Sequence, residues 1–425
     1  MKLKLCPLAP SSQPLSRRFI GVLAALVVCS CGGGHSGISP TDTTGTTGTT
    51  GTTGTSSSNV TISSPSAAGT YWTPNTAIDL SGTTSTTASV VKVTWSNDHG
   101  DTGIAAGTTT WTVPAIPLQS GDNVITATAV DGAGNTSSAS IKITSRTIPP
   151  AGSYVKPGSV GFRGDPTTLT QYLSGDAAPA GCKWTSYGLR CDQDSLTLDH
   201  VHIQGGLYWT GTGSLAITNS VIEGGDSWYT VYAAAETNVA GAQMSISDST
   251  LRWTPGLTEP SGEDVGPFWT RGTQVLTIQR CDISGMPQGL DPGEGSLIDA
   301  NWIHDLFQNG TEDSPTHMDG IFSQGGGNIT IQRNYVDVPT SGAVTAAIFI
   351  QNGDGKDAGI KIYANYLNGG AYVLRNQTGI SVDVVNNTFG AGIYGDVGDV
   401  TGYPGSYGTW SGNVHGNGSA VPRPN

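Results

Sequence analysis

The chain has 425 residues, a formal net charge of −13 and 61 glycines, and only 12% of its residues are charged. A glycine-rich chain with so few charges is typical of an extracellular all-β protein and argues against a cytosolic enzyme. The negative charge disfavours nucleic acid as a partner and, more weakly, a polyanionic glycan.

Residues 1–30 have the features of an export signal. The pair Arg17-Arg18 precedes an apolar run at 19–28 that is too short to cross a membrane. The string V-C-S-C-G (28–32) follows and resembles the cleavage site of a bacterial lipoprotein signal. This resemblance implies a lipid on Cys31 and attachment to the bacterial cell envelope, at the outer membrane or the cell surface. The alternative is an ordinary secretory signal.

Residues 31–58 contain consecutive T-T-G triplets followed by Ser and Thr. Such a composition cannot bury a core, so we expect a disordered, flexible tether. It would hold the rest of the protein away from a membrane surface.

Short alternating runs separated by turn residues predict a separate β-domain at 59–146. The strings S-G-D-N-V-I-T (120–126) and D-G-A-G-N (131–135) resemble bacterial immunoglobulin-like domains. The resemblance implies a β-sandwich with Trp95 and Trp111 in its core. Such a module is expected to act as a spacer, with carbohydrate binding as the alternative.

After an expected linker at 147–154, residues 155–425 contain a recurring eight-residue unit. Its clearest copy is I-T-I-Q-R-N-Y-V (329–336), with apolar residues at positions 1, 3 and 8 and a small or amide residue at position 6. Positions 1 and 3 follow the period of a β-strand. Eight copies begin at unequal spacings, at Leu196, Leu215, Met244, Leu276, Ser296, Ile329, Ile360 and Val382.

Position 6 is asparagine in four successive copies, at Asn301, Asn334, Asn365 and Asn387. Stacked Asn side chains can hydrogen-bond along a ladder, and Asn tolerates the left-handed backbone that a tight bend needs. A second short strand precedes the copies, as in G-I-F-S (320–323). The repeats predict an all-β solenoid, in the form of a right-handed parallel β-helix preceded by the immunoglobulin-like sandwich.

The cysteines fit an exported solenoid. Cys182 and Cys191 close a short loop near the start of the β-helix, where a solenoid needs a cap, and we expect them to form a disulfide. Cys281 lies at position 6 of its repeat, so we expect a buried, unreactive thiol.

Two strings extend the resemblance to known β-helices. G-T-W-S-G-N-V (408–414) and G-G-L-Y-W-T-G-T-G-S-L-A-I-T-N-S-V-I-E-G-G (205–225) resemble secreted bacterial β-helix proteins of the pectate-lyase-like kind. This resemblance covers roughly residues 155–420. It implies the fold and no particular activity.

T-H-M-D-G-I (316–321) resembles the N-T-D-G motif of polygalacturonase-type glycoside hydrolases, which are right-handed β-helices. The resemblance implies that Asp319 is a catalytic carboxylate. The family's Asp-Asp pair is replaced by V-T-A-A-I (344–348), and its Gly-His-Gly and Arg-x-Lys motifs have no counterpart. The family's mechanism is therefore not carried over.

Further candidates for catalysis surround Asp319. Coils of a β-helix stack about 4.8 Å apart, so carboxylates on neighbouring coils can approach the separation of roughly 5 Å found in retaining glycosidases. A histidine between them could shift a pKa or bind sugar hydroxyls. The candidates are Asp291 on the preceding coil and Glu312, Asp313 and His317 just upstream. The alternative follows from strand parity, because Asp319 shares the phase of inward-facing Ile321 and could simply cap a turn.

Candidate substrate-binding residues lie on the strands that precede the repeats. Exposed aromatic faces stack on sugar rings, and arginine can serve as the base of a lyase or as an anion clamp. Some of the aromatic residues must instead lie in the core. The aromatic candidates are Tyr208, Trp209, Trp269 and Phe322, with Tyr232 and Tyr372 on the same strands, and the arginines are Arg271 and Arg375.

These patterns predict a monomeric, surface-anchored protein that binds and cleaves a polysaccharide, as a glycoside hydrolase or a polysaccharide lyase. The alternative is a non-catalytic glycan-binding, matrix or adhesion module on the same solenoid. The only expected membrane contact is the lipid anchor, and no nucleic-acid partner is expected. No cofactor and no metal site are expected from the sequence, although a structural or catalytic calcium ion stays open. The sequence does not name the glycan or the bond.

Overall fold

The computed structural model describes residues 59–67, 69–85, 89–186, 188–224, 229–233, 242–253, 266–269, 275–307, 310–311, 314–315, 318–323, 326–340, 346–351, 359–377, 381–398 and 406–424. The predicted signal peptide, the lipidation site Cys31 and the predicted tether lie outside these residues. So do four candidate site residues, namely Arg271, Glu312, Asp313 and His317, and the side chain of Trp269. Within the described residues, no helix is long and apolar enough to cross a membrane.

The first described part of the chain forms two sheets around a hydrophobic core of their own. Buried and exposed side chains alternate along its longest strand, as expected for a sheet with one buried face. Trp111 is fully buried in this core, and Trp95 packs against it. The predicted β-sandwich is therefore present, while its immunoglobulin-like class stays a prediction. The sheets are, in spatial order, β1 (Asn59–Ser64), β3 (Ala77–Ser85) and β6 (Thr110–Pro117), and β2 (Thr70–Thr73), β8 (Thr136–Ser145), β7 (Gly121–Asp131), β4 (Val90–Asn97) and β5 (Thr102–Ile104).

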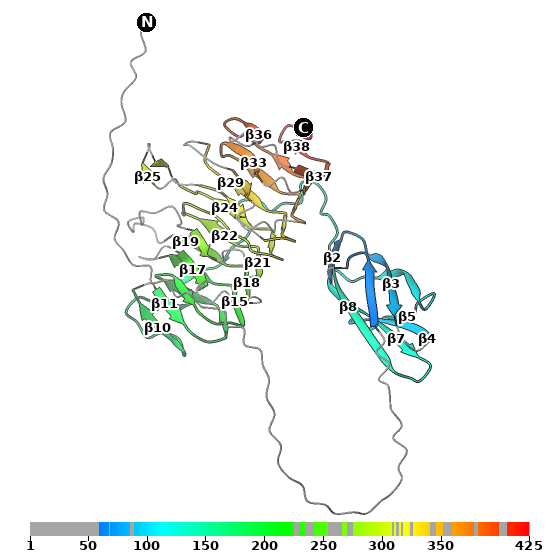
Figure 1. Cartoon of the computed structure of the whole chain (residues 1–425). Coiled ribbons are helices and arrows are strands. Elements are labelled where there is room, and N and C mark those ends of the chain that lie inside the picture. The colour runs from blue at the N-terminus through cyan, green and yellow to red at the C-terminus, as the bar shows by residue number, and fades with distance from the viewer. Residues whose placement is uncertain are drawn as a thin grey trace, which may run out of the picture. The chain divides into compact units, whose positions relative to one another are not determined.

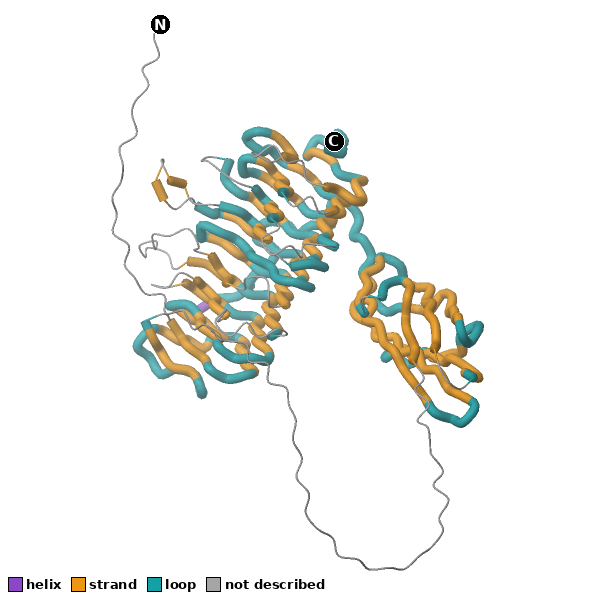
Figure 2. The backbone as a smooth tube through the Cα atoms, viewed as in Figure 1, coloured by secondary structure: helices purple, strands orange, loops and turns teal. Residues whose placement is uncertain are grey.

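From residue 170 onward the chain forms a parallel β-helix with three faces, of which two are long continuous sheets (Figure 1). Short strands of successive coils lie side by side and are joined by loops (Figure 2). The solenoid predicted from the repeats is confirmed by this pairing. A short 3₁₀ helix, η1 (Pro166–Thr168), precedes the first strand.

The first sheet carries positions 1 to 3 of the repeat. Its strands are β12 (Ser195–Asp199), β15 (Ser214–Thr218), β18 (Gln243–Ser247), β21 (Val275–Gln279), β23 (Leu297–Asp299), β28 (Thr330–Gln332), β31 (Lys361–Tyr363), β34 (Ser381–Val385) and β37 (Ser406–Ser411). The second sheet follows each tight bend. Its strands are β9 (Thr170–Leu173), β13 (Val201–Gln204), β16 (Val221–Gly224), β19 (Thr250–Trp253), β22 (Asp282–Ser284), β24 (Trp302–His304), β29 (Tyr335–Asp337), β32 (Tyr366–Asn368), β35 (Thr388–Phe389) and β38 (Val414–His415).

The third sheet precedes the repeat unit in each coil. It has two separate parts. The five-stranded part consists of β10 (Cys182–Thr185), β11 (Gly188–Cys191), β14 (Leu207–Trp209), β17 (Tyr229–Ala233) and β20 (Gly266–Trp269), and the four-stranded part consists of β27 (Ile321–Ser323), β30 (Ile348–Ile350), β33 (Tyr372–Asn376) and β36 (Gly395–Gly398). A parallel bridge between Leu290 and Ile321 adds another coil to the four-stranded part. A two-stranded hairpin, β25 (Gly310–Thr311) and β26 (Ser314–Pro315), lies apart from the three sheets.

The bend between the first and second sheets depends on position 5 of the repeat. In all eight copies this residue has a positive φ between 47° and 61°, even where it is alanine or arginine. The left-handed backbone was expected at position 6, and this prediction is wrong by one residue. The left-handed residue bends the chain sharply, and the next side chain, at position 6, then points into the core.

The position 6 side chains form the predicted asparagine ladder. Asn334 Nδ2 donates to Asn365 Oδ1 at 2.9 Å, and the same oxygen accepts the Asn334 backbone N–H at 2.9 Å. Asn301 makes the same pair of bonds to Asn334, and Asn387 makes them to Asn413, a fifth member that the sequence did not identify. Each amide is almost completely buried, so the ladder satisfies polar groups inside the core.

Serine and cysteine occupy the ladder position in the earlier coils. Ser249 Oγ accepts the Ser220 N–H at 3.1 Å, which continues the pattern with a hydroxyl. Cys281 is fully buried, and burial raises the pKa of its thiol to about 12. The expected buried and unreactive thiol is therefore confirmed as buried. Cys182 and Cys191 face each other across β10 and β11 and form the predicted disulfide.

Candidate functional site

Asp319 lies inside the β-helix and not on its surface. Its side chain is 0% exposed, and Oδ1 accepts the Ala346 backbone N–H of the next coil at 3.0 Å. Its carbonyl oxygen accepts the Gly289 N–H of the preceding coil at 2.8 Å. This geometry fits the turn-capping alternative and gives a substrate no access to the carboxylate.

The glycine in the D-G string has a matching structural role. A Cβ on Gly320 would lie 2.6 Å from the Ala347 carbonyl oxygen, and a Cβ on Gly289 would lie 1.8 Å from the Gly320 oxygen. Only glycine permits such close approach of three successive coils. The string that resembles a catalytic motif is thus explained here by backbone packing.

Asp291 lies next to Leu290, which forms a β-bridge with Ile321 of the third sheet. Leu290 is 1% exposed and bridges to Ile321, which faces the core. Asp291 follows Leu290, and alternation along an extended chain would turn its side chain away from the Leu290 side. Its side chain is 8% exposed. Of the two candidate carboxylates described, Asp291 is the less deeply buried.

Aromatic residues form a column on the outer face of the third sheet in the N-terminal coils. Tyr208 pairs in register with Arg190 and with Tyr232. The two tyrosine rings stack with centroids 4.7 Å apart and an interplanar angle of 12°, and the Arg190 guanidinium lies 5.3 Å from the Tyr208 ring centre. Both tyrosines are half-buried. Parallel rings one coil apart offer a flat, partly apolar surface.

A second aromatic column lies in the C-terminal coils, in a separate four-stranded sheet. Phe322 pairs in register with Phe349, and the two rings stack with centroids 4.9 Å apart. Arg375 pairs with Phe349 and places its guanidinium 4.3 Å from the ring centre. These three residues are buried, although they lie outside the main core: the two phenylalanines form a separate apolar cluster with Ala346.

The structure places the other sequence candidates in different environments. Trp209 lies in the core at 1% exposure and donates from Nε1 to the Gln193 carbonyl at 2.9 Å, so it is removed from the outer face. The backbone of Trp269 pairs with Tyr232 in the outer column. The remaining four candidates lie outside the described residues. The sequence missed Phe349 and Arg190, although both occupy the column position of their strands.

A polar cluster on the second sheet was also missed. Glu223 is 3% exposed, and its carboxylate accepts hydrogen bonds from Arg252 Nε at 3.0 Å and Gln204 Nε2 at 3.0 Å. Burial raises the pKa of Glu223, but its contacts with His202 and Arg252 outweigh this and lower the pKa to about 2. The carboxylate is therefore fully committed to ion pairing and is unsuited to proton transfer near neutral pH.

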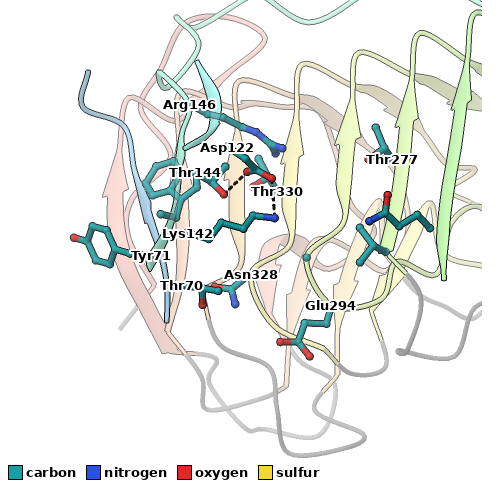
Figure 3. A pocket seen from close by; sticks show the side chains of 14 residues that line it. Thr70, Tyr71, Asp122, Lys142, Thr144, Arg146, Thr277, Glu294, Asn328 and Thr330 are labelled. Atoms are coloured by element: carbon teal, nitrogen blue, oxygen red, sulfur yellow. Dashed lines mark hydrogen bonds and ion pairs between the residues drawn. The ribbon is translucent and has the colours of Figure 1, made fainter. Parts of the chain in front are cut away.

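Another polar surface involves the sandwich and the first sheet (Figure 3). On the sandwich, Asp122 accepts a hydrogen bond from Thr144 Oγ1 at 2.7 Å and lies 2.7 Å from Lys142 Nζ. On the β-helix, the drawn residues include Thr277 and Glu294. None of the residues drawn belongs to the third sheet, so this surface is distinct from the aromatic column. No group of three His, Cys, Asp or Glu side chains within the described residues could hold a metal ion.

Comparison with known proteins does not identify a family for this chain. No family model matches the chain, and no curated protein matches it. Among solved structures, the chain is similar to the family 28 exopolygalacturonase of Yersinia enterocolitica, with 10% identity and a TM-score of 0.32 over 82% of this chain and 86% of that chain. A TM-score this low does not establish a shared fold, so the β-helix rests on its own strand pairing.

Proposed function

We propose that the protein binds a polysaccharide along the outer face of the third sheet. The observation that carries this proposal is the stacked pair Tyr208 and Tyr232 in one register column with Arg190. The C–H faces of sugar rings are apolar, so they pack well against flat aromatic rings. Because the column repeats with the rise of about 4.8 Å per coil, a glycan chain lying along it meets a similar surface at each coil.

The proposal extends to cleavage of the bound chain at Asp291. This carboxylate follows Leu290, which bridges to Ile321 of the third sheet, and it is mostly shielded from water. A carboxylic acid in such a place can protonate a glycosidic oxygen while a base activates water at the anomeric carbon. The sequence alone suggests Glu312 or Asp313 as the partner base. Without such a partner, the protein would be a glycan-binding module.

A panel of purified glycans tests both parts with the full chain. Binding would be measured by calorimetry, and products by reducing ends and by absorbance of unsaturated sugars. Tyr232→Ala should weaken binding, whereas Asp291→Asn should abolish product formation with little change in affinity. Binding without products in the wild-type protein would support the module and contradict cleavage.

Tyr71→Ala provides a matched control, because Tyr71 is an exposed tyrosine on the sandwich. A loss of affinity in Tyr71→Ala alone would move the binding site to the sandwich.

We also propose that the protein is anchored to the cell envelope through a lipid on Cys31. Cys31→Ser should then release the protein from the membrane fraction, and its retention there would contradict the anchor.

A further inference from the structure

The segment between the sandwich and the first strand of the β-helix, residues 149–165, follows the solenoid along the bends between the first and second sheets. Asn386 Nδ2 donates to the Pro149 carbonyl at 3.0 Å. The Val155 N–H donates to the Arg333 carbonyl at 2.9 Å, and the Gly161 N–H donates to the Arg280 carbonyl at 2.8 Å. The three solenoid partners all occupy position 5, in the eighth, sixth and fourth copies of the repeat.

This segment, hereafter the strap, contacts the solenoid at regular intervals along its sequence. The anchor residues Pro149, Val155 and Gly161 are six residues apart, and each step passes two coils. Two coils rise only about 10 Å, which is about half the reach of six extended residues. The excess chain is taken up by a turn between anchors.

Each turn uses the same two residues. Gly152-Ser153 and Gly158-Ser159 lie six residues apart, and both glycines have positive φ, 77° and 70°. The serine hydroxyls donate back to the Pro150 and Lys156 carbonyls at 2.8 and 2.6 Å. The strap is therefore a short repeat whose length matches the coils beneath it.

Side chains add to the attachment. The Tyr154 ring lies 6.1 Å from the Tyr335 ring and 5.5 Å from the Tyr366 ring, and these two rings stack on each other in the sixth and seventh copies. The backbone at Gly161 approaches the second sheet so closely that a Cβ would lie 2.5 Å from the Asp282 Cβ. The Phe162 N–H then donates to Thr250 Oγ1 at 3.1 Å.

We propose that the strap locks the β-helix into a single cooperative unit. In a solenoid each repeat touches only its neighbours, so end coils can open independently of the rest. The strap runs from the eighth copy back to β9, which pairs with β13 of the first copy. Opening of the C-terminal coils must therefore release contacts that hold the chain entering the N-terminal coils.

Hydrogen exchange of the full chain, read by mass spectrometry, tests this proposal. Tyr154→Ala and Gly161→Val should each lower protection at least tenfold in β37, which lies beyond the last strap anchor at Asn386. Tyr154→Phe should behave as wild type, because the ring contacts remain. Ala151→Ser, at an exposed strap position, should also have no effect.

A second measurement distinguishes locking from simple covering. Unfolding by denaturant should give one transition for the wild-type β-helix and separate transitions in the two strap variants. Should the variants lose protection only at the bends around Arg280 and Arg333, with a single transition retained, the strap would be a local cover and the proposal would be overturned. Unchanged protection throughout would also overturn it.

Discussion

Asp319 Oδ1 accepts the backbone N–H of Ala346 at 3.0 Å, across two coils of the β-helix and out of contact with solvent. This bond assigns Asp319 to the interior and leaves Asp291 as the remaining described candidate for the catalytic acid. The two carboxylates therefore predict opposite responses to mutation.

Asp319→Ala should destabilise the fold. It leaves the buried Ala346 N–H without its acceptor, at a cost of about 1–3 kcal/mol. Asp319→Asn should cost less, since the amide oxygen can still accept this bond. Thermal unfolding measures both changes. Complete loss of turnover in Asp319→Asn at an unchanged melting temperature would show instead that this residue is catalytic.

The asparagine ladder makes a second prediction about stability. Asn334 bonds to Asn301 and Asn365 on both sides, so Asn334→Leu removes partners from both neighbours and should cost at least about 1–3 kcal/mol. Asn75→Leu, at an exposed position of the sandwich, is the control. Glycan affinity should not change in either variant. Equal melting temperatures for wild type and Asn334→Leu would contradict a stacked ladder.

His304 predicts a pH dependence of stability. Burial lowers the pKa of this imidazole, but hydrogen bonds at 2.9 Å to Asp282 and at 2.7 Å to Asp305, together with their charges, outweigh burial and raise it above the usual value. A raised pKa in the folded state stabilises the protein fully below the unfolded value of about 6.5. This contribution is lost as pH rises through the folded pKa.

The corresponding experiment compares wild type with His304→Gln between about pH 5.5, where free carboxylates are ionised, and about pH 9. The wild-type advantage in unfolding free energy should be roughly 1 kcal/mol at the lower pH and should shrink at the higher pH. An advantage that grows with pH would mean that the imidazole is neutral in the folded protein.

The repeat made the solenoid predictable, because one eight-residue pattern carries a strand, a bend and a ladder residue. The fifth ladder member, Asn413, escaped detection because its unit, G-T-W-S-G-N-V-H (408–415), has glycine at position 1 and histidine at position 8. An irregularity in the pairing of β34 with β37 accompanies this break.

Strand parity could have separated some of the site candidates. In L-Y-W (207–209) the leucine and the tryptophan share one face, so placing Leu207 in the core also places Trp209 there and turns Tyr208 outward. The attachment of the strap was not predictable in this way. It joins residues as far apart as Pro149 and Asn386, and no periodicity within the eight-residue unit encodes such pairing.

The most direct test of the glycan-binding face is a calorimetric titration of wild type and Tyr232→Ala with the tightest ligand from the panel, with Tyr71→Ala as the control. Loss of one stacking ring should raise Kd by roughly tenfold, equivalent to about 1.4 kcal/mol, and the control should match wild type. An unchanged Kd in Tyr232→Ala would contradict binding on the outer face of the third sheet.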